Sequence, residues 1–467
     1  MVLEHWAPSS GRRELERMLK AIRVSSVDEL YRDVPGEALR VEWDRLPLGE
    51  GRILSEAELA ERLEGLLSRV RVHRDPPPFL GGGSWAHYVP EVVKYIVERG
   101  EFLTSYTPYQ AEASQGLLQA LFEYQSMIAD VYEMDVVNSS LYDGASAAGE
   151  AALMALRVNR RSRRILAVET GNPQRLEAIE SYLAGKGVLE RVPAKRETGG
   201  VDLEVLEDRL RGGGVVAVYL EYPNYLGVVD ENLETAIEAA HKHGALAIVA
   251  ADPLASALYK PPGRMGADIV VGDGQPLGLG MNYGGPSLGI MATRFEARLV
   301  RQMPGRIVGL TVDSRGERAF TLILQTREQH IRRARATSNI TTNEALMALA
   351  AAVYMALHGG WGLRRVAENI WYKTRYAAKR LAEAGLEAPI VEGEVWRDIP
   401  VASPIPFQDL AARLREHGIL AGPPLEGVTG WLDSKTGLVA VTELHRKRHI
   451  DMLAEKVRGV LEDVQAG

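Results

Sequence analysis

Short apolar runs rich in β-branched residues alternate with helical segments over the middle of the chain, from about residue 115 to 345. The predicted strands are 164–168, 215–221, 246–250, 268–271 and 288–292. Helical segments between them include 203–210 and 231–243. Strands that are apolar throughout are buried on both faces, and strands separated by helices usually run parallel. We therefore predict an α/β fold whose mainly parallel sheet is covered on both faces, with a ligand site at the carboxyl ends of its strands.

The flanking regions divide the chain into three predicted parts. Residues 9–71 form a helical arm, in which Ser55 and Glu58 have the spacing of a capping box. An alanine-rich helix over 343–358 is interrupted by Gly359-Gly360, and strands over 391–399 and 438–442 and a helix over 406–417 follow. The predicted parts are an N-terminal helical arm and interface segment (1–105), a large α/β domain (106–345) and a small C-terminal α+β domain (346–467).

Composition excludes several classes of function. A net charge of −7 argues against a general nucleic-acid binder, and the lack of cysteine excludes disulfides and catalytic thiols. The His241-Lys242-His243 run has no further ligands at suitable spacing, so no metal site is predicted. We expect a cytoplasmic protein without membrane spans. The N-terminal residues lack the basic leader and the apolar run of a signal peptide. No stretch is expected to reach the ~18 uncharged apolar residues of a membrane span.

Two segments carry features of a cofactor site. Gly144, Ala145 and Ser146 open a helix after a turn, where exposed backbone N–H groups could hold an anion such as a phosphate. Alternatively, Asp143 and Ser146 only cap this helix. Asp252 follows the strand that ends near residue 251, where an aspartate could pair with a pyridinium nitrogen or could simply open a turn before Pro253.

The chain has no lysine between Lys260 and Lys373. An enzyme built on pyridoxal phosphate needs a lysine amine to hold the aldehyde. The segment where that lysine is expected ends in Gln275 and Pro276, and neither residue can form an imine. Lys260 comes too soon after Asp252, because such a lysine normally lies beyond a further strand, and we interpret it as a solvated loop residue.

Residues 101–110 are dense in hydroxyl and aromatic groups but belong to no clear helix or strand. The residues of this segment whose side chains could contact a ligand or a partner are Tyr106, Thr107, Tyr109 and Gln110. Such loops often line a binding site or an interface, although buried tyrosines are also common in cores.

Several long motifs occur in a characteristic order. They are 79–84 with His87, Tyr88 and Pro90; 106–112 with 114–116; 142–145; 271–278; 303–306; 325–333; and 336–340. Over roughly residues 5–460 the chain thereby resembles the P-protein family of the glycine cleavage system, glycine decarboxylase, in particular subunit 1 (alpha) of its split two-subunit form.

The resemblance implies a fold-type-I, aminotransferase-like architecture of the kind found in pyridoxal-phosphate-dependent transferases. It also implies a homologous beta subunit that carries pyridoxal phosphate and its lysine, in an α2β2 heterotetramer. The assembled enzyme would decarboxylate glycine, release CO2 and pass the aminomethyl group to the lipoyl arm of the H protein. Gln275 and Pro276 fall in the family's lysine segment, so this chain is expected to bind no cofactor covalently and to be inactive alone. Asp252, Gly144, Ala145 and Ser146 would then be vestigial.

The resemblance also directs attention to the partner's site. The loop of Tyr106, Thr107, Tyr109 and Gln110 is the first candidate to reach it, and His87, Tyr88, Arg327, Ser338 and Asn339 are weaker candidates. Two alternatives stay open. The chain could be a self-sufficient pyridoxal-phosphate lyase or decarboxylase that uses Lys260, or a non-catalytic scaffold or regulatory homologue.

Overall fold

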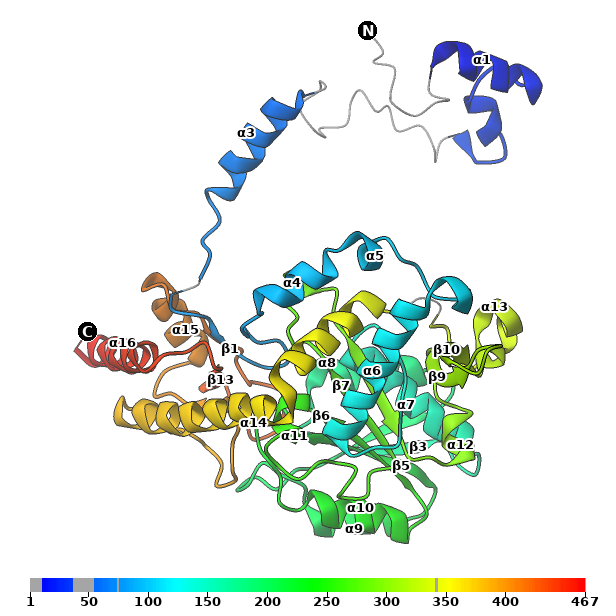
Figure 1. The fold of residues 1–467 in the computed structure, drawn as a ribbon. Coiled ribbons are helices and arrows are strands. Elements are labelled where there is room, and N and C mark those ends of the chain that lie inside the picture. The colour runs from blue at the N-terminus through cyan, green and yellow to red at the C-terminus, as the bar shows by residue number, and fades with distance from the viewer. Residues whose placement is uncertain (1–10, 37–53, 74, 341–342, 467) are drawn as a thin grey trace. The chain divides into compact units, whose positions relative to one another are not determined.

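The computed structural model describes residues 11–36, 54–73, 75–340 and 343–466 (Figure 1). These residues fall into two compact units, Met1–Val72 and His73–Gly467. The first contains α1 (Arg12–Ala21), η1 (Asp28–Tyr31) and α3 (Glu56–Leu67). Ser55 and Glu58 form the predicted capping box at the start of α3. The rest of the predicted arm, residues 9–10 and 37–53, lies outside the described residues.

Within the described residues, seven strands of the second unit form one sheet in the order β2-β8-β7-β6-β5-β3-β4. Their bounds are β2 Val136–Val137, β3 Arg164–Val168, β4 Val188–Val192, β5 Val215–Tyr222, β6 Leu246–Ala251, β7 Ile269–Asp273 and β8 Gly289–Thr293. The pairings from β4 to β7 are parallel, and β8 is antiparallel to both of its neighbours. The predicted mainly parallel sheet is confirmed, while β2 and β4 were not anticipated.

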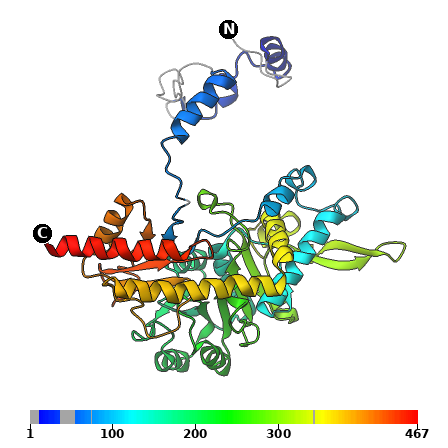
Figure 2. The ribbon, with the colours of Figure 1, turned by 60° about the vertical axis from the view of Figure 1, so that its left-hand side comes forward.

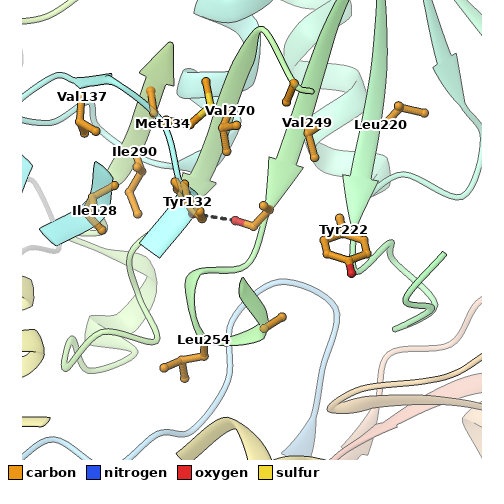
Figure 3. Packing of buried hydrophobic residues seen from close by; sticks show 14 of the residues in the cluster. Ile128, Tyr132, Met134, Val137, Leu220, Tyr222, Val249, Leu254, Val270 and Ile290 are labelled. Carbon is orange, nitrogen blue, oxygen red and sulfur yellow. Dashed lines mark hydrogen bonds between the residues drawn. The ribbon is translucent and has the colours of Figure 1, made fainter. Parts of the chain in front are cut away.

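Helices cover both faces of this sheet because successive strand residues point to opposite sides. In β6, Ile248 packs in one cluster with α7 (Gly144–Val158) and α8 (Pro173–Leu183), whereas Val249 packs in another with α6 (Gln115–Tyr132) and α10 (Leu233–Lys242). Figure 3 shows the second cluster, in which the Tyr132 hydroxyl donates to the Ala251 carbonyl over 2.8 Å. The prediction that helices 203–210 and 231–243 separate the strands is confirmed by α9 (Leu203–Arg211) and α10.

Shorter elements surround the sheet. They are β1 Phe79–Leu80, α4 Glu91–Val97, α5 Gly100–Leu103, η3 Ala111–Ala113, α11 Pro253–Ser256, η4 Asn282–Gly284, α12 Ala297–Val300, β9 Ile307–Val312, β10 Arg318–Ile323, η5 Gln325–Arg327, α13 Gln329–Arg332, η6 Arg333–Arg335 and β12 Ala421–Gly422. Strands β9 and β10 pair as an antiparallel hairpin apart from the main sheet, and this hairpin was not predicted.

The long helix α14 (Ala345–Glu383) connects the sheet region to the C-terminal region. Its backbone leaves helical geometry at Gly359, with φ of +59°, which confirms the predicted interruption, and the helix then resumes. Beyond it lie β11 (Asp398–Ala402), α15 (Phe407–Glu416), β13 (Thr436–Ala440) and α16 (Lys447–Ala466). Figure 2 shows α14 and α16 side by side, and their apolar faces share one buried cluster. The domain boundaries at 105 and 345 stay predictions.

Two expectations about this region were wrong. The strand predicted over 391–399 is irregular until β11 starts at Asp398, because Val391 and Trp396 are buried by loop packing and Val395 forms only an isolated antiparallel bridge with Val228. Helix α14 contains an apolar stretch long enough by length and composition to cross a membrane, contrary to the expectation of none, and 44% of that stretch is buried within the fold. The same composition suits a core helix, and α14 packs against the main apolar cluster at its N-terminal half.

Candidate functional site

The carboxyl ends of β5, β6 and β7 meet at one edge of the sheet, as predicted for parallel neighbours. Glu221 lies near the end of β5, Asp252 follows β6, and Asp273 ends β7. These three carboxylates line a cavity of about 50 Å³, together with Arg175, Trp85 and Arg397. The edge is thus charged and almost filled by side chains.

Asp252 is paired with a guanidinium group from the C-terminal region. One of its oxygens caps α11 and accepts from the backbone of Leu254 and Ala255 at 2.8 and 3.0 Å. Its other oxygen lies 2.7 Å from Nη2 of Arg397, and both side chains are at least nine-tenths buried. The centre of the Arg397 guanidinium is 3.2 Å from the centroid of the Trp85 ring, the geometry of a stacked cation–π pair.

A neighbouring carboxylate secures this arrangement. Asp398 lies 3.6 Å from Nε of Arg397 and accepts from the indole N–H of Trp85 at 3.0 Å. Burial raises the pKa of Asp398, although Arg397 and Trp85 oppose that shift. Trp85 and Arg397 are therefore both held by groups that stabilise their contact.

The N-terminus of α7 binds the carboxylate of Asp273, a residue of the same chain. The backbone N–H of Gly144 donates to Asp273 at 2.9 Å, and the backbone N–H of Gln275 and the hydroxyl of Ser287 donate to its other oxygen. Burial raises the pKa of Asp273 while these donors lower it. Asp143 caps the same helix through the N–H of Ser146 at 2.6 Å. Asp143 thus caps this helix, as one of the two interpretations had it, and a carboxylate of the chain itself lies at the N–H of Gly144.

Arg175 and Glu221 complete the cluster. They are 3.0 Å apart, and the hydroxyl of Tyr219 donates to the same Glu221 oxygen at 2.8 Å. Burial opposes the charge on Arg175, but the attraction of Glu221 and Tyr219 outweighs it and raises the pKa of Arg175.

The residues at this edge do not fit pyridoxal phosphate. Gln275 exchanges hydrogen bonds with the backbone of Trp85, and Pro276 is buried and carries no amine. Lys260 pairs with Glu234 at 2.6 Å, is partly exposed and does not line the cavity. A cavity of about 50 Å³ is also far smaller than the ~300–1,000 Å³ of usual ligand pockets. A wider open hollow of about 820 Å³ adjoins it, with Gly144, Ala145 and Gln275 among its lining residues.

The predicted tyrosine loop joins α5 to η3 and is fixed at one position. The Tyr109 hydroxyl accepts from Nη2 of Arg306 at 2.6 Å, and its ring centroid lies 4.9 Å from that of His330. Arg306 is 1% exposed and pairs with Glu328 at 3.4 Å. Tyr106 is 70% exposed, so the loop is anchored at Tyr109 and presents Tyr106 outward. Gln110 is exposed and Thr107 is half-buried.

His87 and Tyr88 share one carboxylate. Nδ1 of His87 lies 2.9 Å from Glu443, and the backbone N–H of Tyr88 donates to the other oxygen at 2.6 Å. Burial alone would raise the pKa of Glu443, but the charge and hydrogen bond of His87 and the N–H of Tyr88 lower it to about 2. The His87 ring is buried, whereas Tyr88 is 56% exposed.

The remaining predicted residues lie elsewhere. Arg327 is buried and donates to the carbonyls of Leu324 and Gly305, and burial lowers its pKa to about 10. Ser338 donates to Glu150 at 2.7 Å and lines, with the exposed Asn339, a separate hollow of about 920 Å³. The structure thus brings Asp252, the start of α7 and Gln275 to one edge, but it does not join the interface candidates to them in one cavity.

Sequence reasoning missed several members of the charged edge. Asp273 lies within a motif that was already noted and Trp85 directly follows another, so their positions could have drawn attention. Arg175 follows the cap of α8, and Arg397 lies in the small C-terminal region. Nothing in the local sequence around Arg397 indicates that it folds back onto Asp252.

Comparison with known proteins gives a consistent result. The family described as glycine cleavage system P-protein matches residues 5–457. A protein of Aeropyrum pernix, named probable glycine dehydrogenase (decarboxylating) subunit 1, is 58% identical over 98% of this chain and 100% of its own length. A protein of the same name from Staphylothermus marinus is 47% identical over 98% of this chain and 99% of its own.

Solved structures agree. A glycine decarboxylase (P-protein) of the glycine cleavage system, in inhibitor-bound form, aligns with a TM-score of 0.84 at 38% identity, over 98% of this chain and 100% of that one. An alanine–glyoxylate aminotransferase from Nostoc sp. aligns at 18% identity with a TM-score of 0.59, over 84% of this chain and 97% of that one. The predicted fold-type-I, aminotransferase-like architecture is confirmed.

Proposed function

This chain belongs to the glycine cleavage system P-protein family, and we propose that it acts as the alpha subunit of a split glycine decarboxylase whose covalent chemistry takes place on a second subunit. The partner is a homologous beta subunit that carries pyridoxal phosphate and its lysine. Together the two subunits decarboxylate glycine, release CO2 and transfer the aminomethyl group to the lipoyl arm of the H protein.

One observation carries the proposal. The chain has the fold of this enzyme class and resembles proteins named subunit 1 over nearly its whole length, yet Gln275 and Pro276 stand in the lysine segment. Asp252, the carboxylate at the expected place for a cofactor ring, is paired with Arg397 instead. An enzyme that needs an amine and a free carboxylate must therefore obtain them from another chain.

We assign the supporting role on this chain to the segment from Tyr106 to Gln110. Its anchor, Tyr109 on Arg306, fixes the backbone, while Tyr106 presents its ring and hydroxyl to the surroundings. Exposed aromatic side chains on a fixed loop suit a subunit interface, where they lose little conformational freedom on binding. His87, Tyr88, Arg327, Ser338 and Asn339 are weaker candidates for the same role.

The proposed assembly is an α2β2 heterotetramer in the cytoplasm that is served by the H protein. The test is to produce this chain alone, the lysine-bearing homologue alone, and both together. The mixture should co-elute as one species and exchange labelled CO2 into the carboxyl group of glycine, and this chain alone should not. Exchange by this chain alone, or a failure of the two chains to associate at micromolar concentration, would contradict the proposal.

A further inference from the structure

We propose that Arg397 and Asp273 occupy, within this chain, the places at which the ring and the phosphate of pyridoxal phosphate would bind. The chain then excludes the cofactor by covering the ring position with Arg397 and by placing a carboxylate at the phosphate position, in addition to lacking the lysine. This inference rests on the proposed function only for the identity of the cofactor, because it concerns residues of this chain alone.

The ring position is defined by Asp252. A carboxylate at the carboxyl end of a central parallel strand is suited to pair with a pyridinium nitrogen. Here the same carboxylate lies 2.7 Å from the guanidinium of Arg397, which like a pyridinium ring is planar and cationic. Trp85 stacks at 3.2 Å on that guanidinium. The arginine thus satisfies the carboxylate and takes the space beside it.

The phosphate position is defined by α7. The N-terminus of a helix binds anions through its free N–H groups and the helix dipole. α7 has fifteen residues, and its first N–H, from Gly144, donates to Asp273, which lies half-buried at the end of β7. A Cβ placed on Gly144 would lie 3.0 Å from the Cβ of Asp273, so little space separates the helix start from this side chain. A phosphate would meet a carboxylate there, and the two negative charges would repel.

The backbone at Arg397 supports a specific placement of this side chain. Its φ is +67°, a left-handed conformation that residues other than glycine rarely adopt. The neighbouring structure holds it there, since the N–H of Arg397 donates to Thr374 on α14 and the N–H of Asp398 donates to the carbonyl of Trp396. The fold thus maintains an unfavourable conformation that directs the arginine onto Asp252.

The experiment measures binding of pyridoxine phosphate, which has the ring and the phosphate but no aldehyde and so forms no imine with surface lysines. The full-length chain, Arg397→Ala, Asp273→Asn and the double variant are titrated by calorimetry, with Arg375→Ala as control. Arg375 is an exposed arginine of α14 that pairs with Glu394. Circular dichroism first checks that each variant is folded. If Arg397→Ala does not fold, Arg397→Gln, which removes the positive charge, shortens the side chain and keeps the Asp252 carboxylate, replaces it in the single and double variants.

We expect the double variant to bind at least tenfold more tightly than the unaltered chain, the Arg397 variant to fall between them, and the control to match the unaltered chain. Binding by the unaltered chain as tight as that of the double variant would overturn the inference, because the site would then be open. A double variant that binds no more tightly than the unaltered chain would overturn it too. Either result leaves the proposed function intact, because that function is tested by assembly and exchange with the partner.

Discussion

At the scale of single residues, the charged groups at the sheet edge stabilise one another. Glu221 pairs with Arg175, Asp252 pairs with Arg397, and Asp273 accepts three hydrogen bonds. A charge that leaves water needs such compensation, because an unpaired buried ion loses several kcal/mol of hydration. The edge therefore behaves as one network. Removing one member leaves its partner buried without compensation, and this destabilises the fold.

The pair of Asp252 and Arg397 gives the clearest case. Replacing Arg397 by Met should destabilise the chain by about 3–5 kcal/mol, because Asp252 is then buried without a counter-charge. Adding Asp252→Asn should recover most of this loss, since the amide keeps the oxygen that caps α11. Urea denaturation of both variants measures the difference. Arg375→Ala, at an exposed ion pair, should cost under about 1 kcal/mol, and an equal loss there would contradict the argument.

Glu443 predicts a dependence of stability on pH. Its pKa is about 2 in the folded chain against about 4.5 for an unperturbed glutamate, mainly because His87 outweighs the effect of burial. A lowered carboxyl pKa stabilises the folded state above the unfolded pKa, and this contribution is lost as pH falls from about 4.5 to about 2. Glu443→Gln should therefore cost about 3 kcal/mol at pH 7 and little near pH 2.

The measurement for Glu443 is the unfolding free energy of the unaltered chain and the variant at several pH values between 2 and 7. Glu455→Gln, at an exposed position on α16, is the control and should follow the unaltered chain throughout. A cost of Glu443→Gln that stayed constant over this range would show that the residue acts by packing and not through its charge.

At the scale of elements, the bend in α14 depends on one glycine. Gly359 has φ of +59° and ψ of 176°, a region that residues with a side chain avoid, whereas the adjacent Gly360 does not have a positive φ. A Cβ at either position would meet no atom within 4 Å. Gly359→Ala should thus cost about 1–3 kcal/mol through backbone strain alone. Gly360→Ala should be neutral or stabilise by up to about 1 kcal/mol. Thermal unfolding of the two variants checks this, and equal effects would refute a glycine-specific bend.

The elements that the sequence predicted well share a physical basis. β3, β5, β6, β7 and β8 are buried on both faces, so apolar β-branched runs identify them. β4 lies at the edge of the sheet with Leu189 and Glu190 half-buried. β9 is exposed over its second half and β10 is exposed at both ends, so the composition of these strands resembles that of loops. The strand predicted over 391–399, of which only residues 398 and 399 belong to β11, shows the reverse error, because residues buried in loops are also apolar.

The sequence predicted only those parts of the candidate site that lie at the ends of predicted helices and strands. Asp252 and the start of α7 follow directly from the ends of predicted elements. Their partners Arg397 and Trp85 come from distant parts of the chain, and the pairing is set by how the C-terminal region folds against the sheet. The interface residues have the same limitation, because a partner's surface defines their role.

At the scale of the whole molecule, the second unit retains the core of its enzyme class while the charged edge is satisfied internally. With the cofactor excluded from this edge, as proposed above, the surface is the part of the chain that can contribute to catalysis. The loop anchored by Tyr109 is the part of that surface that combines a fixed backbone with exposed aromatic and hydroxyl groups. The whole-molecule prediction therefore concerns the assembled enzyme.

Tyr106→Ala should lower the turnover of the assembled enzyme by about tenfold or more, which corresponds to ~1.4 kcal/mol of transition-state stabilisation. Tyr106→Phe separates the two parts of the side chain, because it keeps the ring and removes the hydroxyl. If the hydroxyl orients a reacting group, Phe should lose as much turnover as Ala. If the ring only packs at the interface, Phe should restore it. The assay is exchange of labelled CO2 into glycine, with the assembly followed by size-exclusion chromatography on the same samples.

Tyr372→Ala is the matched control, since this tyrosine is 65% exposed on α14 and should leave exchange unchanged. Unaltered exchange in Tyr106→Ala with the assembly intact would remove the loop from the catalytic role and leave it a structural part of the chain. Exchange that fell only in proportion to dissociated subunits would assign Tyr106 to assembly. Only a fall in turnover with the assembly intact would show that this chain, which lacks the Schiff-base lysine, contributes a residue to the active site of the assembled enzyme.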